Sequence, residues 1–127
     1  MTLREGFYTW LNAQGFVTSG RVYANGYPQN PPGFPLIRIN KQGEVPDQTL
    51  AGGKEFTEQT FQLDVFATTY LSASTTIEAV KTALIDFAGD MGTVEVQDTR
   101  LDSETEFYED DLKLHVISID VTMWSNA

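Results

Sequence analysis

The stretch Phe61–Ala67 alternates in polarity and then leads, within a few residues, into a segment with helical spacing. Side chains alternate between the two faces of a β-strand, so every second residue of this stretch shares one face: Phe61, Leu63, Val65 and Ala67. From Ser74 onward, the apolar residues recur as they do on one side of a helix: Ile77, Val80, Leu84 and Phe87. A strand joined directly to a helix is a rigid scaffold without a reactive group of its own.

Capping patterns mark the starts of two predicted helices. Thr2 followed by Glu5 is a capping box, in which each residue satisfies a free backbone donor at the helix start. Thr75 followed by Glu78 repeats the pattern later in the chain. Glycines follow both segments and favour helix termination. We therefore expect helices at Leu3–Asn12 and Thr75–Ala88.

Extended segments account for much of the remaining chain. They alternate in polarity and are rich in β-branched and aromatic residues, as strands are. In the last segment the apolar face changes near Val116–Ile117, which either a β-bulge or burial of both faces would explain. We expect strands at Arg21–Tyr23, Leu36–Lys41, Phe56–Ala67, Thr93–Leu101 and Leu112–Trp124.

Three connections complete the predicted fold. Residues 25–35 contain four prolines, which exclude a helix or a central strand. Residues 43–55 suggest a second long loop, and residues 102–111 an acidic turn. The order helix, strands, helix, strands predicts an α+β fold. We expect a single domain over residues 1–127, with an antiparallel sheet of about four to five strands packed with two helices.

Composition narrows the possible functions. The chain of 127 residues has no cysteine, which excludes disulfides, thiolate nucleophiles and zinc–cysteine sites. Its 18 acidic and 8 basic residues give a formal charge of −10, which disfavours attraction to nucleic acid. No apolar run approaches the roughly 20 residues that span a bilayer, and no signal peptide is visible. We expect a soluble intracellular protein that does not contact a membrane.

Motifs for catalysis are missing from the sequence. His115 is the only histidine, and on its predicted strand it is expected to face solvent. Gly52-Gly53-Lys54 is followed by Glu55 and a strand, whereas a phosphate-binding loop leads into a helix. We therefore predict no catalytic residues, no cofactor and no metal site, and no enzymatic activity.

The region between Asp98 and Asp111 holds seven carboxylates in fourteen residues, with Arg100 as its only cation. The spacing and central glycine of an EF-hand are absent. A solvated turn is one interpretation of this region. An electrostatic surface is a second, and a metal site a third.

The order of the scaffold segments resembles one known family. The strand and turn Gln62–Tyr70, followed by a helix, resemble the tail-completion (tail terminator) proteins of long-tailed bacteriophages. The opening helix, the segment Phe34–Ile39 after the proline loop and the closing strand His115–Trp124 are also similar, in the same order. The resemblance covers nearly the whole chain and rests on this ordered combination, since no single motif is diagnostic.

This resemblance implies a structural protein of the virion, assembled in the host cytoplasm. Members are thought to form a ring, usually of six copies, on the head-proximal end of the tail tube. The ring stops tube polymerisation and joins the tail to the neck or connector proteins of the head. The implied partners are further copies of the chain, the major tail-tube protein and the neck proteins, while DNA passes through without specific binding. The alternatives are another neck or tail-tube subunit of similar fold, or a small metal-binding or ligand-binding α+β domain.

Candidate interface residues lie in the two long connections and have no evident core role: Tyr27, Phe34, Asp47 and Lys54. An aromatic residue in a stiff loop can anchor a partner, or it can fold back over the sheet. In a ring, part of the acidic run is expected to line the channel, where like charge keeps DNA from adhering. The residues expected to face the channel are Glu104, Glu106 and Glu109.

Overall fold

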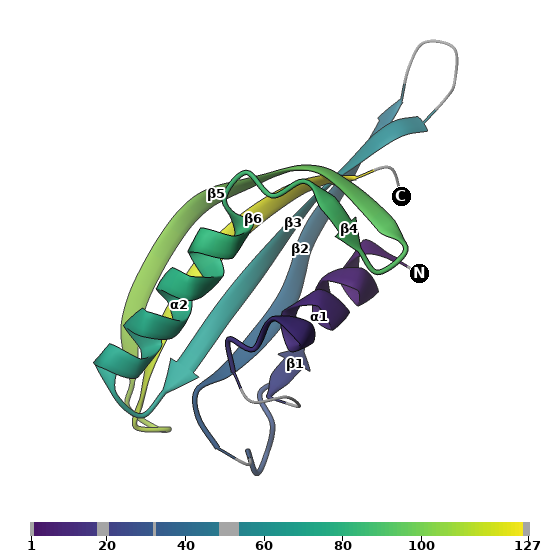
Figure 1. Ribbon diagram of the computed structural model, residues 1–127. Helices are drawn as coiled ribbons and strands as arrows, with labels where there is room; N and C mark the ends of the chain where they lie inside the picture. The colour runs from purple at the N-terminus through teal and green to yellow at the C-terminus, as the bar shows by residue number, and fades with distance from the viewer. Residues whose placement is uncertain (1, 18–20, 32, 49–53, 126–127) are drawn as a thin grey trace.

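The computed structural model describes residues 2–17, 21–31, 33–48 and 54–125 of the chain. In these residues two helices lie on one side of a six-stranded sheet (Figure 1). The helices are α1 (Leu3–Gln14) and α2 (Tyr70–Leu84). The strands are β1 (Val22–Ala24), β2 (Leu36–Gln48), β3 (Lys54–Ala67), β4 (Gly89–Met91), β5 (Val94–Glu109) and β6 (Leu114–Ser125).

The strands are arranged in the order β1-β2-β3-β6-β5-β4. All neighbouring pairs are antiparallel except β1 and β2, which run parallel. The predicted α+β class is correct, but the prediction of four to five antiparallel strands is wrong, because the sheet has six strands and is mixed. The parallel pair forms because the proline-containing connection is long enough to carry the chain back before β2 begins.

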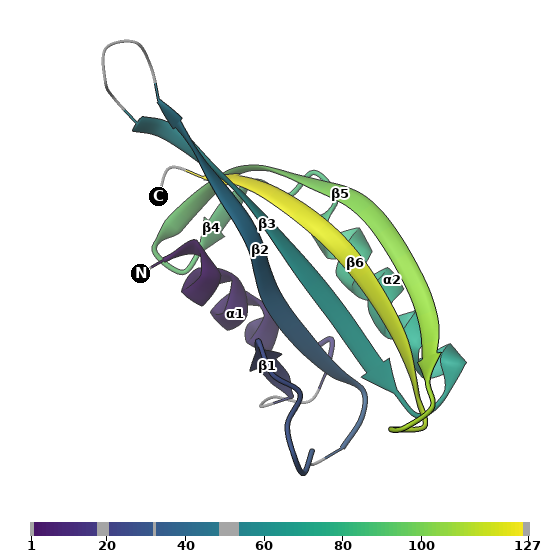
Figure 2. The ribbon, with the colours of Figure 1, turned by 180° about the vertical axis from the view of Figure 1, so that it is seen from behind.

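The main core lies between the helices and the sheet. In both views the strands bend around the side that carries the helices (Figures 1 and 2). The face predicted for β3 is confirmed, because Phe61, Leu63 and Val65 are fully buried there. The ring of Phe7 on α1 meets that of Phe61 edge-on, with centroids 5.2 Å apart.

Helix α1 begins and ends close to the predicted residues. Thr2 and Glu5 form the predicted capping box, and Gly15 adopts a left-handed conformation at the C-terminus. Gly6 allows the helix to approach β4 closely, since a Cβ atom there would lie 2.2 Å from the carbonyl oxygen of Met91.

Helix α2 begins five residues earlier than predicted, at Tyr70. Its N-cap is Thr69, whose hydroxyl accepts a hydrogen bond from the backbone NH of Ser72. Thr75 and Glu78 therefore lie inside the helix, and the capping-box prediction at Thr75 is wrong. The earlier start directly after β3 places Ala73 in the core, and this burial outweighs the weaker helix propensity of the first turn.

The predicted loop over residues 43–55 is also wrong. β2 continues to Gln48 and β3 starts at Lys54, so most of this segment is a β-hairpin, whose central residues 49–53 lie outside the described residues. In the outer part of the hairpin, β2 and β3 pair only with each other, because the pairing of β3 with β6 starts at Thr57. The two strands consequently project beyond the rest of the sheet (Figure 2).

The acidic segment predicted as a turn belongs to β5, which extends to Glu109. It pairs along its length with β6, and two register shifts interrupt the ladder. Those backbone hydrogen bonds override the low strand propensity of aspartate and glutamate. In β6, burial of both faces explains the change of phase, since its pairing with β3 is continuous from Ser125 to His115.

Candidate assembly surfaces

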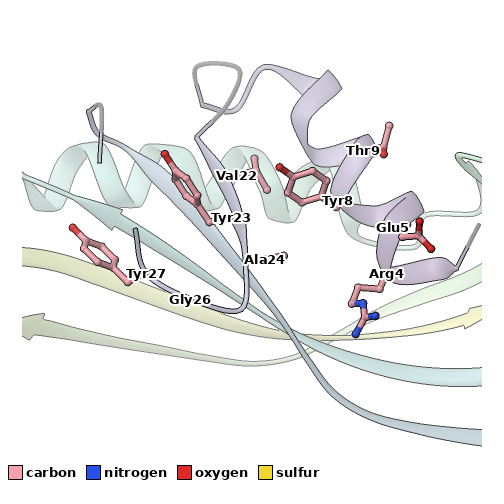
Figure 3. A pocket seen from close by; sticks show the side chains of 9 residues that line it. All are labelled: Arg4, Glu5, Tyr8, Thr9, Val22, Tyr23, Ala24, Gly26 and Tyr27. Carbon is pink, nitrogen blue, oxygen red and sulfur yellow. The ribbon is translucent and has the colours of Figure 1, made fainter. Parts of the chain in front are cut away.

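An open groove of 540 Å³ lies between α1 and β1. Arg4, Glu5, Tyr8 and Thr9 line it from α1, and the opposite side is formed by β1 and the turn that follows (Figure 3). Three tyrosines give the groove an aromatic lining: Tyr8, Tyr23 and Tyr27. Glu5 is held by the helix cap, and its hydrogen bonds with Thr2 lower its pKa. Arg4 has no ion pair among the described side chains.

The proline-containing connection folds back over the sheet rather than standing away from it. The ring of Tyr27 lies 5.0 Å from that of Phe66, and burial raises the pKa of the Tyr27 phenol. Tyr27, Phe34 and Tyr23 pack against a second apolar cluster on the face opposite the helices: Leu36, Phe66, Leu114 and Val116. The sequence left two roles for Tyr27 and Phe34, anchoring a partner or packing over the sheet. For Phe34 the structure supports packing. Tyr27 both packs and lines the groove.

Three glutamates are expected to face a channel. Two of them, Glu104 and Glu106, contact α2 instead. Glu104 accepts a hydrogen bond from Lys81 at 2.9 Å, and Glu106 accepts one from the Tyr70 hydroxyl. These contacts raise the pKa of Lys81 and the pKa of Tyr70. Glu109 pairs with Leu114 on the opposite face of the sheet. The three carboxylates therefore do not form one surface.

Exposed apolar side chains border both faces of the sheet at the end beside the N-terminus of α2, and we call this set the apolar patch. It includes five of the large apolar side chains that remain exposed: Tyr70, Leu71, Phe107, Tyr108 and Leu112. His115 is half-buried there rather than facing solvent, with its ring 5.0 Å from that of Tyr108. We call the turn at residues 109–113, which joins β5 to β6, the acidic tip. It places Glu109, Asp110 and Asp111 next to this patch.

The face opposite the helices holds a polar network at its centre. Asp64 is 1% exposed and accepts hydrogen bonds from Arg38, at 2.8 and 2.6 Å. Gln62 and Ser118 donate to the other carboxylate oxygen. Farther along this face, a hydrogen bond from Thr122 and the nearby Arg100 lower the pKa of Asp102. These interactions compensate the buried charge, so they explain packing rather than a reactive site.

Asp47 and Lys54, the other two interface candidates, lie in the projecting β2–β3 hairpin. They belong to adjacent cross-strand pairs, Asp47 with Phe56 and Gln48 with Lys54. The structure therefore keeps them near each other but far along the hairpin from the proline-containing connection that holds Tyr27 and Phe34.

Among the described residues, no three histidine, aspartate or glutamate side chains are arranged to hold a metal ion. Neither described helix is long and apolar enough to cross a membrane.

Sequence reasoning missed the α1–β1 groove and the apolar patch. The groove is lined by residues that are far apart in the sequence. From the sequence alone, its tyrosines are equally compatible with burial in the core. One signal for the patch was present, since Phe107, Tyr108 and Leu112 interrupt the acidic run. Apolar side chains within a charged segment are candidates for contact with a partner.

Comparisons with known proteins agree with the resemblance in the sequence. No curated protein matches the chain. A solved structure described as "Virion of native gene transfer agent (GTA) particle" contains a chain of similar fold, with a TM-score of 0.70 and 11% identity. The match covers 96% of this chain and 94% of that one. The family described as "Tail completion protein gp17" matches residues 8–126. The chain therefore belongs to the tail completion protein family, whose members are structural proteins of phage tails.

Proposed function

We propose that this protein forms a ring, of six copies, on the head-proximal end of a phage tail tube. The ring ends tube polymerisation and provides the surface to which the neck proteins attach. Membership of the tail completion family is the observation that carries the proposal. A stiff curved sheet with a projecting hairpin also suits a subunit that contacts several neighbours.

Exposed strand edges support self-association. β5 pairs with β4 only at residues 94–96, so the rest of its outer edge has no strand partner among the described residues. The short strand β1 borders the sheet at its other end. Unpaired backbone groups on such edges provide sites at which another chain can add hydrogen bonds.

The projecting hairpin is the proposed contact with the tube or the neck. Its outer end projects beyond the sheet, and the sequence of that end includes the oppositely charged residues Asp47 and Lys54. Asp47→Lys and Lys54→Glu should each weaken attachment to tube ends while leaving the solution assembly unchanged. The contrary result, full capping by both variants, would assign tube contact to another surface.

Charge supports passage of DNA through the ring without adhesion. Six copies at −10 each bring a formal charge of about −60 near the channel. Because Glu104 and Glu106 already contact α2, Glu109 is the sharper test of a channel-facing carboxylate. Glu109→Lys should slow DNA ejection, whereas Asp90→Lys, an equal charge change on β4, should not. Normal ejection by Glu109→Lys would argue against a channel position for this residue.

Capping of purified tail tubes tests the proposed function directly. Added protein should appear by negative stain as one ring at a single tube end, and tube growth should stop there. A monomeric state in dilute solution does not by itself contradict the proposal, because assembly on the tube is compatible with it. A protein that stays monomeric and also fails to cap tubes would overturn it. Growth of the pure protein into long tubes would instead support the alternative of a tube subunit.

A further inference from the structure

We propose that the α1–β1 groove of each copy receives residues 110–112 of the acidic tip of the next copy, and that Glu109, at the base of the tip, stays outside the groove. This inference rests on the proposed self-assembly and specifies how neighbouring subunits recognise each other. Both surfaces carry exposed aromatic or apolar side chains, and each holds charged groups without an ion-pair partner among the described residues: Arg4 in the groove, and Asp110 and Asp111 in the tip.

The groove offers an aromatic lining and the cation of Arg4, whereas the Glu5 carboxylate that also lines it accepts hydrogen bonds from Thr2. Tyr8 is 36% exposed beside Arg4, and both project from the exposed side of α1 (Figure 3). A volume of 540 Å³ accommodates a few side chains of a docking loop.

The acidic tip offers the opposite properties. Asp110 and Asp111 are exposed and have no hydrogen-bond or ion-pair partner among the described residues. Leu112 beside them is 42% exposed, and Tyr108 at the end of β5 is 49% exposed. An exposed apolar side chain in the turn, with a second at the end of the adjoining strand, makes this tip a candidate for contact with another protein.

The groove and the acidic tip lie at different places in the sheet, so the proposed contact is head-to-tail: it joins two different surfaces of neighbouring copies. β1 stands at one end of the strand order, whereas β5 and β6 lie on the other side of its centre. The acidic tip and the groove also lie apart on the molecule, the tip beside the start of α2 and the groove beside α1 (Figure 1). Contact between two different surfaces leaves one of each free on every dimer, and such contacts close into a ring when the rotation allows.

Cross-linking tests the contact directly, because the natural chain has no cysteine. A variant carrying both Thr9→Cys, in the groove, and Leu112→Cys, in the acidic tip, should form intermolecular disulfides on mild oxidation. A disulfide needs Cα atoms within about 7 Å, so it reports close approach. We expect a ladder up to the ring size, both in concentrated solution and on tube ends.

The controls separate head-to-tail docking from random collision. Each single variant alone should give no ladder, and an equal mixture of the two should stop at the dimer. A variant with Thr9→Cys and Asp90→Cys moves the second thiol to β4 and should give no ladder. Laddering in this control equal to that of the test variant, or none in the test variant, would overturn the inference.

Charge reversal provides a second test that does not depend on disulfides. Arg4→Glu should weaken association at least about tenfold, because it sets like charges against each other. The double change Asp110→Lys and Asp111→Lys should do the same. Combining all three changes in one chain should restore association, which would be measured by sedimentation velocity and by binding to tubes. Failure of this rescue would contradict the proposed pairing.

These outcomes distinguish the inference from the proposed function. If the wild-type protein caps tubes and the double-cysteine variant caps them without a ladder, the inference is wrong and the function stands. If the wild-type protein neither associates nor caps tubes, both the inference and the proposed function are wrong. Capture of the acidic tip by a tube or neck protein instead would leave the double-cysteine variant without a ladder on tube ends, and it would also overturn the inference.

Discussion

The hydroxyl of Tyr70 donates hydrogen bonds to both carboxylate oxygens of Glu106, at 3.1 and 3.0 Å. The contact joins the first residue of α2 to the middle of the acidic half of β5. It shows that the acidic strand is held to the helix by specific polar contacts, with Lys81 and Glu104 forming a second one nearby.

The first prediction concerns the pKa of Tyr70. The hydrogen bond to Glu106 and the negative charge of that carboxylate raise this pKa above 10.0, because both favour the neutral phenol. Glu106→Gln should therefore lower it toward 10.0, as measured by NMR titration of the labelled ring. Because the folded pKa is the higher one, the stabilisation is fully present below pH 10 and is lost as the pH rises through the folded value. Glu109→Gln, on the other face, is the control and should leave the Tyr70 pKa unchanged.

The start of α2 can be tested by removing hydroxyl groups. Thr69→Ala deletes the N-cap acceptor for the Ser72 NH and should lower the free energy of unfolding by about 1 kcal/mol. Thr75→Ala, at the exposed site where the sequence suggested a cap, should change it by less than about 0.5 kcal/mol. Urea denaturation would measure both. An equal loss at Thr75 would contradict the observed helix start.

The contact between α1 and β4 predicts an unusual response to alanine. In an exposed helix, replacing glycine by alanine is stabilising by up to about 1 kcal/mol. Gly6→Ala should instead destabilise the fold by about 1–3 kcal/mol, because the new methyl group would meet the Met91 carbonyl. Thr9→Ala, on the exposed side of the same helix, serves as the reference and should be neutral or slightly stabilising in thermal unfolding. Stabilisation by Gly6→Ala would show that the helix and strand are farther apart.

Buried charge on the face opposite the helices makes Asp64 a sensitive position. Asp64→Ala removes the partner of Arg38 and leaves Gln62 and Ser118 without their acceptor. We expect a loss of about 3 kcal/mol in unfolding free energy, typical of removing one member of a buried pair. Asp90→Ala on the exposed surface should cost less than about 0.5 kcal/mol. A small effect at Asp64 would mean that the network contributes little to stability.

Local sequence patterns predicted α1 and the core face of β3 well. The capping box of α1 involves residues three positions apart, and its final glycine adopts the left-handed conformation that glycine favours. The alternation of Phe61, Leu63 and Val65 depends only on the geometry of one strand. The same local rules gave a wrong start for α2, because Thr69 and Thr75 are both plausible caps and only packing on the sheet distinguishes them.

The sequence by itself determined the α+β class, the absence of cysteine chemistry, the acidic charge and the order of segments that resembles the tail completion family. Only the tertiary structure decided that the acidic run is a strand and that residues 43–48 and 54–55 belong to a β-hairpin, whose outer end projects beyond the sheet. It also brought Arg4 and Tyr8 together with Tyr27 in one groove. The physical reason is that strand pairing and groove formation depend on partners distant in sequence, such as β6 for β5, whose cross-strand hydrogen bonds outweigh local propensity.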